Sequence, residues 1–129
     1  MDFKKCLFAA CLSFAFFFSS AQKLYIAENG AQHIQRSNID GSNLELLNTA
    51  GQVGPIRDIV IDEQRSNAFW IEINPPNAQI KKAKLESISG TVRLGTVSNY
   101  IQVSSSSNNF QSLAINPQTR ELFVSNNGG

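Results

Sequence analysis

The sequence predicts an all-β protein made of part of a β-propeller, preceded by a secretory leader. Short runs of β-branched and aromatic residues alternate with clusters of Gly, Pro, Asn and Asp. No stretch shows sustained 3.6-residue periodicity, which argues against helices. The strand pattern also recurs at intervals of roughly 40–50 residues, each long enough for about four strands, which is typical of a propeller blade.

The pattern of charged, apolar and small residues in the first 21 positions predicts a signal peptide. Lys4 and Lys5 precede an apolar run over Cys6–Phe18, and Ser19 and Ala21 place small residues at a cleavage point after Ala21. We therefore expect a mature domain over residues 22–129, secreted or exposed on the extracellular side of the plasma membrane.

Two other interpretations of the leader are weaker. The apolar run of 13 residues is shorter than the ~20 needed to cross a bilayer, so we expect no membrane span. A lipoprotein leader would be processed at Cys11, but Phe8 is a poor residue for that signal and the apolar run continues past the cysteine.

The mature segment is electrically balanced and contains no cysteine. Asp2, Lys4 and Lys5 lie in the leader, so nine of the 11 basic and nine of the 10 acidic residues remain. No long tract carries one sign of charge, which argues against nucleic-acid binding. Because Cys6 and Cys11 also lie in the leader, the domain must be stable without disulfides.

Ten strands are expected in the mature segment. In chain order they are Leu24–Ala27, His33–Ile39, Leu44–Leu47, Ile56–Ile61, Ala68–Ile73, Gln79–Leu85, Thr91–Val97, Tyr100–Val103, Gln111–Ile115 and Leu122–Ser125. They are rich in β-branched and aromatic residues or alternate apolar with polar ones. Turn-forming clusters follow the first, second, fourth, fifth and ninth strands, at Glu28–Gly30, Asp40–Ser42, Glu63–Asn67, Asn74–Asn77 and Asn116–Gln118.

Two self-alignments define the repeat. Residues 56–70 align without a gap on residues 110–124, at an offset of 54, with a polar turn at the same place in both. At an offset of 44, residues 24–28 align on residues 68–72. When a gap of two residues is allowed after this stretch, residues 34–39 align on residues 80–85.

These units resemble the YWTD (class B) repeats of the low-density-lipoprotein receptor family, which build a six-bladed propeller. In that family a Tyr-Trp-Thr-Asp strand is followed by Ile-x-Arg/Lys-Ala-x-Leu-Asp-Gly-Ser. Here Tyr25–Glu28 and Phe69–Glu72 occupy the aromatic strand, with glutamate in place of the final aspartate, and Phe123–Asn126 is a third, more divergent copy. Ile34–Ser42 matches the second motif best, and Ile80–Leu85 is a copy that lacks Asp-Gly-Ser. Divergent copies of this kind are also similar to those of sevenless/ROS-type receptors.

Structural roles are expected for the repeat residues, namely Tyr25, Glu28, Arg36, Asp40, Gly41, Asp62, Phe69, Trp70, Glu72 and Phe123. Side chains that alternate along an aromatic strand point to opposite sheet faces, so neighbouring blades can enclose them. Asp40-Gly41 supplies the positive φ of a tight turn. We expect Glu28 and Glu72 to accept hydrogen bonds from nearby backbone or from Arg36 or Lys82, as structural rather than catalytic groups.

The mature segment is too short for the propeller that it resembles. Six blades of roughly 45 residues need about 270 residues. Residues 22–129 hold one nearly complete unit (Ile56–Val97), a partial unit before it and half a unit after it. We therefore expect a fragment of a larger receptor, with open strand edges and apolar faces when it stands alone.

Residues with catalytic or ligand-binding chemistry are sparse. His33, the single histidine, lies at the start of a strand and lacks a partner that would make it a general base. Calcium binding through Asp58, Asp62 and Asn116 stays open, although no EF-hand spacing exists. The Lys81–Lys84 segment is expected to form ordinary solvated surface, because Lys81 faces away from the other two lysines of this segment. Apart from this open question of calcium, we expect no enzymatic activity, cofactor or metal.

The resemblance implies a non-enzymatic module that binds a protein ligand or neighbouring receptor modules. The candidate docking loops follow the two aromatic strands and contain Asn29, Gln32, Asn74, Pro75, Pro76 and Asn77. The two prolines stiffen their loop, which reduces the entropy lost on docking.

Two alternatives remain open. One is a fragment of a six-bladed hydrolase of the gluconolactonase/paraoxonase class, because Ser112–Pro117 and Leu122–Asn126 also look similar to its repeats. The other is a short secreted β protein with no independent activity.

Overall fold

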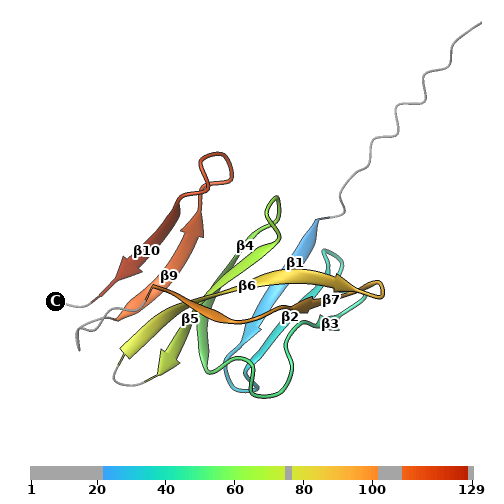
Figure 1. Ribbon diagram of the computed structural model, residues 1–129, viewed down its shortest axis with the longest axis horizontal. Coiled ribbons are helices and arrows are strands. Elements are labelled where there is room, and N and C mark those ends of the chain that lie inside the picture. The colour runs from blue at the N-terminus through green and yellow to red at the C-terminus, as the bar shows by residue number, and fades with distance from the viewer. Residues whose placement is uncertain (1–21, 75–76, 102–108, 128–129) are drawn as a thin grey trace, which may run out of the picture.

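A computed structural model describes residues 22–74, 77–101 and 109–127, and this part of the chain is all-β and contains no helix (Figure 1). It has ten strands: β1 (Lys23–Glu28), β2 (His33–Asn38), β3 (Glu45–Leu46), β4 (Ile56–Asp62), β5 (Asn67–Asn74), β6 (Asn77–Ile88), β7 (Thr91–Leu94), β8 (Ser98–Ile101), β9 (Phe110–Ile115) and β10 (Leu122–Asn126). Each corresponds to one of the ten expected strands, so the all-β prediction is confirmed. No helix long and apolar enough to cross a membrane occurs among these residues.

The ends of some strands differ from the expected ones: β6 is longer at both ends than the expected Gln79–Leu85, and β7 is shorter than expected. The sequence predicts a strand to Val97, whereas β7 ends at Leu94. There the amides of Leu94 and Gly95 donate to Leu47 O and Lys84 O, both at 2.8 Å, and the chain then turns toward β8. Part of the eighth expected strand, residues 102–103, lies outside the described residues.

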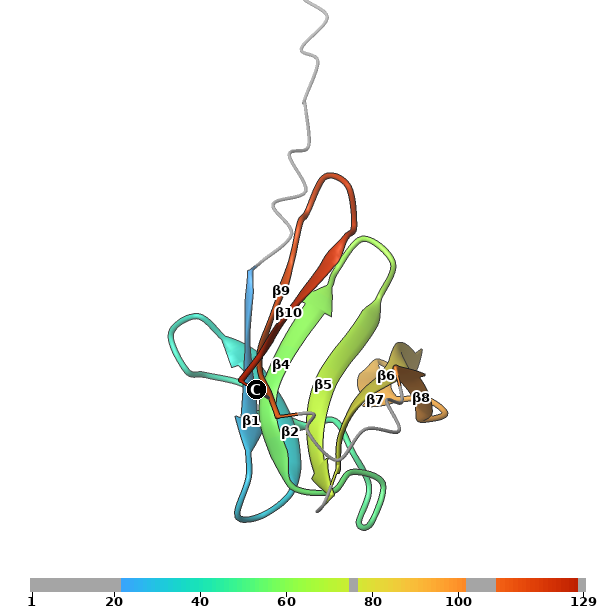
Figure 2. The ribbon, with the colours of Figure 1, turned by 90° about the vertical axis from the view of Figure 1, so that its left-hand side faces the viewer.

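The strands form three antiparallel sheets, which we call sheets 1, 2 and 3 in chain order (Figures 1 and 2). Sheet 1 is β1-β2-β3, and sheet 3 is the β9-β10 hairpin. Sheet 2, in the middle, runs β4-β5-β6-β7, and β8 also pairs with β6. The long strand β6 pairs with β5 over its first part and with β7 over its last four residues.

The repeat seen in the sequence corresponds to equivalent hairpins in successive sheets. Residues 56–70 span most of the β4-β5 hairpin of sheet 2, and residues 110–124 span most of the β9-β10 hairpin of sheet 3. Likewise, β1-β2 of sheet 1 corresponds to β5-β6 of sheet 2. The similar stretches therefore lie in separate sheets rather than pairing within one.

The first hydrophobic cluster lies between sheets 1 and 2. Trp70 and Ala68 of β5 are completely buried in it, together with Ile34 of β2. Tyr25 and Ala27 of β1 pack against the same cluster. One face of sheet 1 is thus covered by one face of sheet 2.

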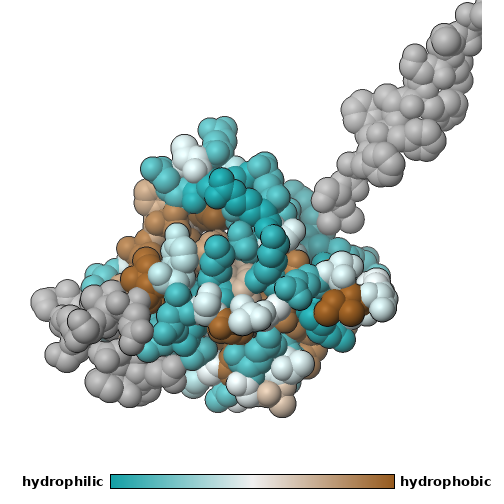
Figure 3. Space-filling view, in the orientation of Figure 1, coloured by the Kyte–Doolittle hydropathy of each residue, from teal (hydrophilic) through white to brown (hydrophobic). Residues whose placement is uncertain are grey.

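The second hydrophobic cluster lies between sheets 2 and 3. It contains Phe69 and Ile71, the neighbours of Trp70 that point to the other face of β5, with Leu122 and Val124 of β10 packed against them. Figure 3 shows apolar residues gathered between sheets 2 and 3 on one side of the molecule. Sheet 2 is therefore buried on both faces, as the alternation of Phe69, Trp70 and Ile71 predicts.

The β4-β5 and β9-β10 turns share their backbone conformation. Ser66 and Arg120, which are 54 residues apart, both adopt a left-handed conformation with φ of 52° and 66°. The residue before each turn is also equivalent: Asp62 Oδ1 accepts from the Arg65 amide, and Asn116 Oδ1 accepts from the equivalent Thr119 amide, both at 3.2 Å. Asp and Asn suit this position because their side chains can bond to backbone amides further along the turn.

Candidate functional site

The β1-β2 turn and the paired ends of β5 and β6, which carry the described residues predicted to dock a partner, lie at the same end of neighbouring sheets (Figures 1 and 2). Asn29 and Gln32 are exposed in the β1-β2 turn. Asn74 and Asn77 face each other in register at the ends of β5 and β6. The remaining two predicted residues, Pro75 and Pro76, lie outside the described residues.

The β1-β2 loop is held by a side chain that the sequence did not single out. Asn48, in the segment after β3, is buried, and its Oδ1 accepts from the Ile34 amide at 2.7 Å. Its Nδ2 donates to Gln32 O at 3.0 Å, while the Gln32 amide donates to Asn29 O at 3.3 Å. Gln32 has a φ of 55°, so these bonds hold a backbone conformation that side chains other than Gly, Asn and Asp seldom adopt.

Glu72 lies near the end of β5 and is almost completely buried. Its Oε2 accepts from the Gly54 amide at 2.9 Å and from the Trp70 indole at 3.4 Å. Its Oε1 is 3.8 Å from Lys81 Nζ. The prediction of a backbone donor is confirmed, but the prediction of Lys82 as the basic partner is wrong. Lys81 pairs with Trp70 in register and shares the face of Glu72, whereas Lys82 points to the opposite face.

Glu28, the counterpart of Glu72 in sheet 1, is largely exposed. Its carboxylate lies 4.0 Å from His33 Nδ1, at the base of the β1-β2 loop. The expected partner, Arg36, instead bonds to Glu45, which it faces across β2 and β3, with Nε 2.5 Å from Oε2. This hydrogen bond lowers the pKa of Glu45.

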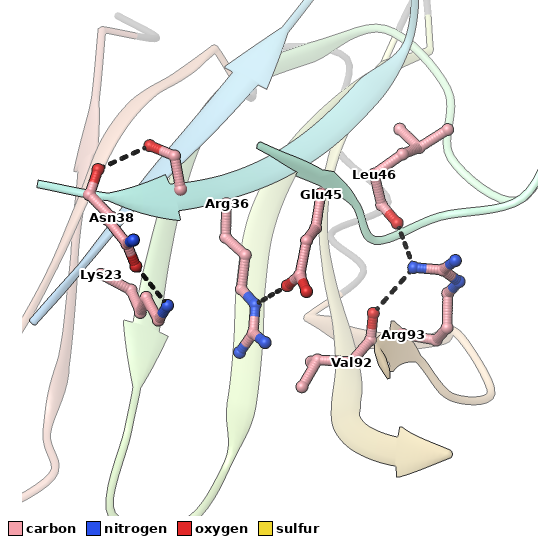
Figure 4. A network of polar contacts seen from close by, with 8 residues as sticks. Lys23, Arg36, Asn38, Glu45, Leu46, Val92 and Arg93 are labelled. Atoms are coloured by element: carbon pink, nitrogen blue, oxygen red, sulfur yellow. Dashed lines mark hydrogen bonds and ion pairs between the residues drawn. The ribbon is translucent and has the colours of Figure 1, made fainter. Parts of the chain in front are cut away.

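Figure 4 shows the surroundings of the Arg36–Glu45 pair. On one side Lys23 Nζ donates to Asn38 Oδ1 at 2.6 Å. On the other side Arg93 Nη1 donates to Leu46 O at 2.7 Å and so ties β7 of sheet 2 to β3 of sheet 1. The Arg93 contact therefore braces sheet 1 against sheet 2, whereas the other two contacts join strands within sheet 1.

Tyr25 and the Asp40-Gly41 turn were both expected to have structural roles, and their surroundings are as follows. Tyr25 lines a hollow of about 310 Å³ between sheets 1 and 2 together with Arg36 and Glu63. Burial raises the pKa of Tyr25, an effect that its hydrogen bond with Arg36 opposes. In the turn, Gly41 has a φ of 81°, and hydrogen bonds from Ser42 lower the pKa of Asp40.

A polar hollow of about 730 Å³ lies on sheet 2, and part of its lining comes from the Lys81–Lys84 segment, which was expected to form ordinary solvated surface. Its lining contains three cationic side chains, Arg65, Lys82 and Lys84, and no carboxylate. The ammonium group of Lys82 lies 5.5 Å from the centre of the Phe69 ring and 5.8 Å from that of Tyr100. The excess of positive charge can attract an anionic group to this surface.

The oxygen ligands considered for calcium are engaged by the protein. Asp58 accepts from the Ile59 amide at 2.8 Å and from the Leu113 amide, across sheets 2 and 3, at 2.7 Å. Asp62 is buried and accepts from Arg120 Nη1 at 3.1 Å. Within the described ranges, no group of three or more His, Cys, Asp or Glu side chains is placed to hold a metal ion.

Comparison with known proteins leaves the family of this chain open. No protein-family model matches it, and a search of curated proteins found no match.

Proposed function

We propose that the chain is part of a non-enzymatic, extracellular protein-binding module of the type found in lipoprotein receptors and Wnt co-receptors. A protein partner docks on the loops that follow β1 and β5. The observation that carries this proposal is that the β1-β2 turn and the paired ends of β5 and β6, which belong to equivalent hairpins, lie at one end of adjacent sheets (Figure 1). Loops presented by a rigid scaffold are the usual location of binding residues.

The packing of the sheets supports the propeller part of this proposal. Successive sheets repeat the same hairpins, and the middle sheet is buried on both faces by its neighbours. This arrangement is what consecutive blades of a partial propeller require. The bonds that Asn48 makes to the β1-β2 loop reduce the freedom that this loop would lose on docking.

Secretion is tested by expressing the full chain with its own leader in secreting cells. We expect the protein in the medium to begin at Gln22, as N-terminal sequencing would show. Retention in the cell with Met1 still present would contradict an extracellular function.

Docking is tested by the binding of the labelled, secreted protein to intact cells. We expect binding that saturates and is lost when the cells are first treated with trypsin, because the partner is a protein. A loop variant with Asn29→Ala, Gln32→Ala, Asn74→Ala and Asn77→Ala should bind at least about tenfold more weakly, a loss of about 1.4 kcal/mol.

The matched control changes turns at the opposite end of the molecule, in sheets 2 and 3. Gln64→Ala and Gln118→Ala lie in the β4-β5 and β9-β10 turns and should leave binding unchanged. Equal binding by the loop variant and the wild type would refute the docking face. Calcium-dependent thermal stabilisation together with lactone hydrolysis would favour the hydrolase instead.

A further inference from the structure

Phe69 and Phe123 occupy the same position in successive sheets but differ greatly in exposure. Both lie on the face of their strand that points along the stack, away from the preceding sheet. Phe69 is covered by sheet 3 and is 7% exposed, whereas no further sheet of the described residues covers Phe123, which is 56% exposed. Ala114, opposite Phe123 in register, is also exposed. We call this outward surface of sheet 3, Phe123 with Ala114, the front face.

The other end of the stack also presents an apolar face. Leu24 and Ile26 of β1 correspond to Ala68 and Trp70 of β5, which are completely buried against sheet 1. In sheet 1 the same positions point away from sheet 2 and are 48% and 36% exposed. Leu46 of β3 lies on the same side and is exposed as well. We call Leu24, Ile26 and Leu46 the rear face.

The front and rear faces are the two halves of an interface that occurs twice within the chain. Sheet 1 packs its forward side on the backward side of sheet 2, and sheet 2 does the same with sheet 3. We propose that the front face of one copy of this chain binds the rear face of a second copy and so continues the stack. The partner is a second copy because Leu24 and Ile26 of the rear face correspond to Ala68 and Trp70, which already cover a front-type face inside the chain.

The polar residues beside this interface are compatible with a head-to-tail contact. Between sheets 2 and 3, Asp62 pairs with Arg120. At the repeat offsets of 54 and 44 residues, Asn116 takes the place of Asp62 and Gln22 takes the place of Arg120. The contact between copies thus sets the side-chain amides of Asn116 and Gln22 where the internal contact has an ion pair.

A head-to-tail contact is heterologous, so the two faces are different and each can be blocked separately. A front-to-front contact would have no counterpart within the chain. This difference gives a test that depends on neither the ligand nor the docking loops, so its result is independent of the proposed function.

The experiment measures the mass of the purified secreted protein by sedimentation velocity from about 1 µM to about 100 µM, a range that covers micromolar dissociation constants. We expect the wild type to associate as its concentration rises. Phe123→Glu blocks the front face and Ile26→Glu blocks the rear face, so each variant alone should stay monomeric. An equimolar mixture of the two should form a 1:1 dimer and nothing larger, because one open front face meets one open rear face.

Ile88→Glu is the matched control. Ile88 is an apolar side chain with an exposure similar to that of Phe123, but it lies at the β6-β7 turn, outside both faces. This variant should associate like the wild type. Phe123→Ser and Ile26→Ser repeat the test without adding charge, and far-UV circular dichroism verifies the fold of every variant.

Three results would overturn the proposal. The first is a wild type that remains monomeric up to the highest concentration. The second is a mixture of the two blocked variants that remains monomeric although the wild type associates. The third is continued dimerisation of Ile26→Glu alone, which would indicate a front-to-front contact.

Discussion

Arg120 donates from Nη1 to Asp62 Oδ1 at 3.1 Å and so joins the β9-β10 turn of sheet 3 to the end of β4 in sheet 2. Asp62 is 3% exposed, so little water can replace the guanidinium. The same oxygen accepts one further bond, from the Arg65 amide. Without Arg120, a buried carboxylate would keep a single donor among these contacts.

Loss of this pair should destabilise the fold. We expect Arg120→Gln to lower the free energy of unfolding by about 3 kcal/mol, because it leaves a buried charge without its partner. Arg65→Gln, in the exposed β4-β5 turn, should change it by less than about 0.5 kcal/mol. Urea titration followed by the fluorescence of Trp70, the single tryptophan, measures both. Equal effects of the two substitutions would show that the ion pair contributes nothing specific.

Gly54 and Gly95 both lie against a glutamate side chain but differ in how freely that side chain can move. A Cβ at Gly54 would lie 2.9 Å from Cδ of Glu72, which is buried and bonded to the Gly54 amide itself. A Cβ at Gly95 would meet the carboxylate of Glu86, an exposed side chain that can swing away. Gly54→Ala should therefore cost about 2 kcal/mol in unfolding free energy, as overpacking does, and Gly95→Ala less than about 0.5 kcal/mol.

The Gly54 effect has an internal check. In a Glu72→Ala background the atoms that a Cβ would strike are gone, so adding Gly54→Ala should cost much less than it does in the wild type. Chemical denaturation of the two single variants and the double variant gives this coupling. Strict additivity would mean that the clash with Glu72 is not the cause.

Glu72 and Glu28 are equivalent in sequence but should differ in their effect on stability. Glu72→Ala removes the acceptor of the Gly54 amide and the Trp70 indole, and we expect a loss of about 2–3 kcal/mol. Glu28→Ala removes an exposed, 4.0 Å contact with His33 and should cost less than about 0.5 kcal/mol. Thermal unfolding monitored by circular dichroism compares them, and a larger loss for Glu28→Ala would contradict the structural role of Glu72.

The strands and their repetition were predictable because both depend on local sequence. Alternation around Phe69 and Trp70 defines a strand with two covered faces, and the 54-residue offset predicts that the β4-β5 and β9-β10 hairpins are equivalent. The all-β fold follows from these observations. Its continuation into a propeller is the part that we propose.

The polar partners were harder to predict because they depend on the register between strands and on contacts between sheets. Lys81 and Lys82 are adjacent in sequence, and only the pairing of β5 with β6 decides which of them shares a face with Glu72. Arg120 and Asp62 are 58 residues apart, and no local pattern connects them. The polar partners therefore follow from strand register and sheet packing, which composition and residue spacing do not determine.

The Arg36–Glu45 pair should make stability depend on pH in the acid range. Arg36 lowers the pKa of Glu45 in the folded protein, so the unfolded chain binds a proton at this carboxyl at higher pH than the folded chain does. The stabilisation is fully present above the unfolded pKa of about 4.3, and it is lost as the pH falls through the lower folded value. We expect Glu45→Gln to flatten the rise in unfolding free energy between about pH 3 and pH 5. Arg36→Gln combined with Glu45→Gln should flatten it no further, because the pair acts as one unit. Urea titrations across this range measure the slopes, and a Glu45→Gln slope equal to that of the wild type would refute the assignment.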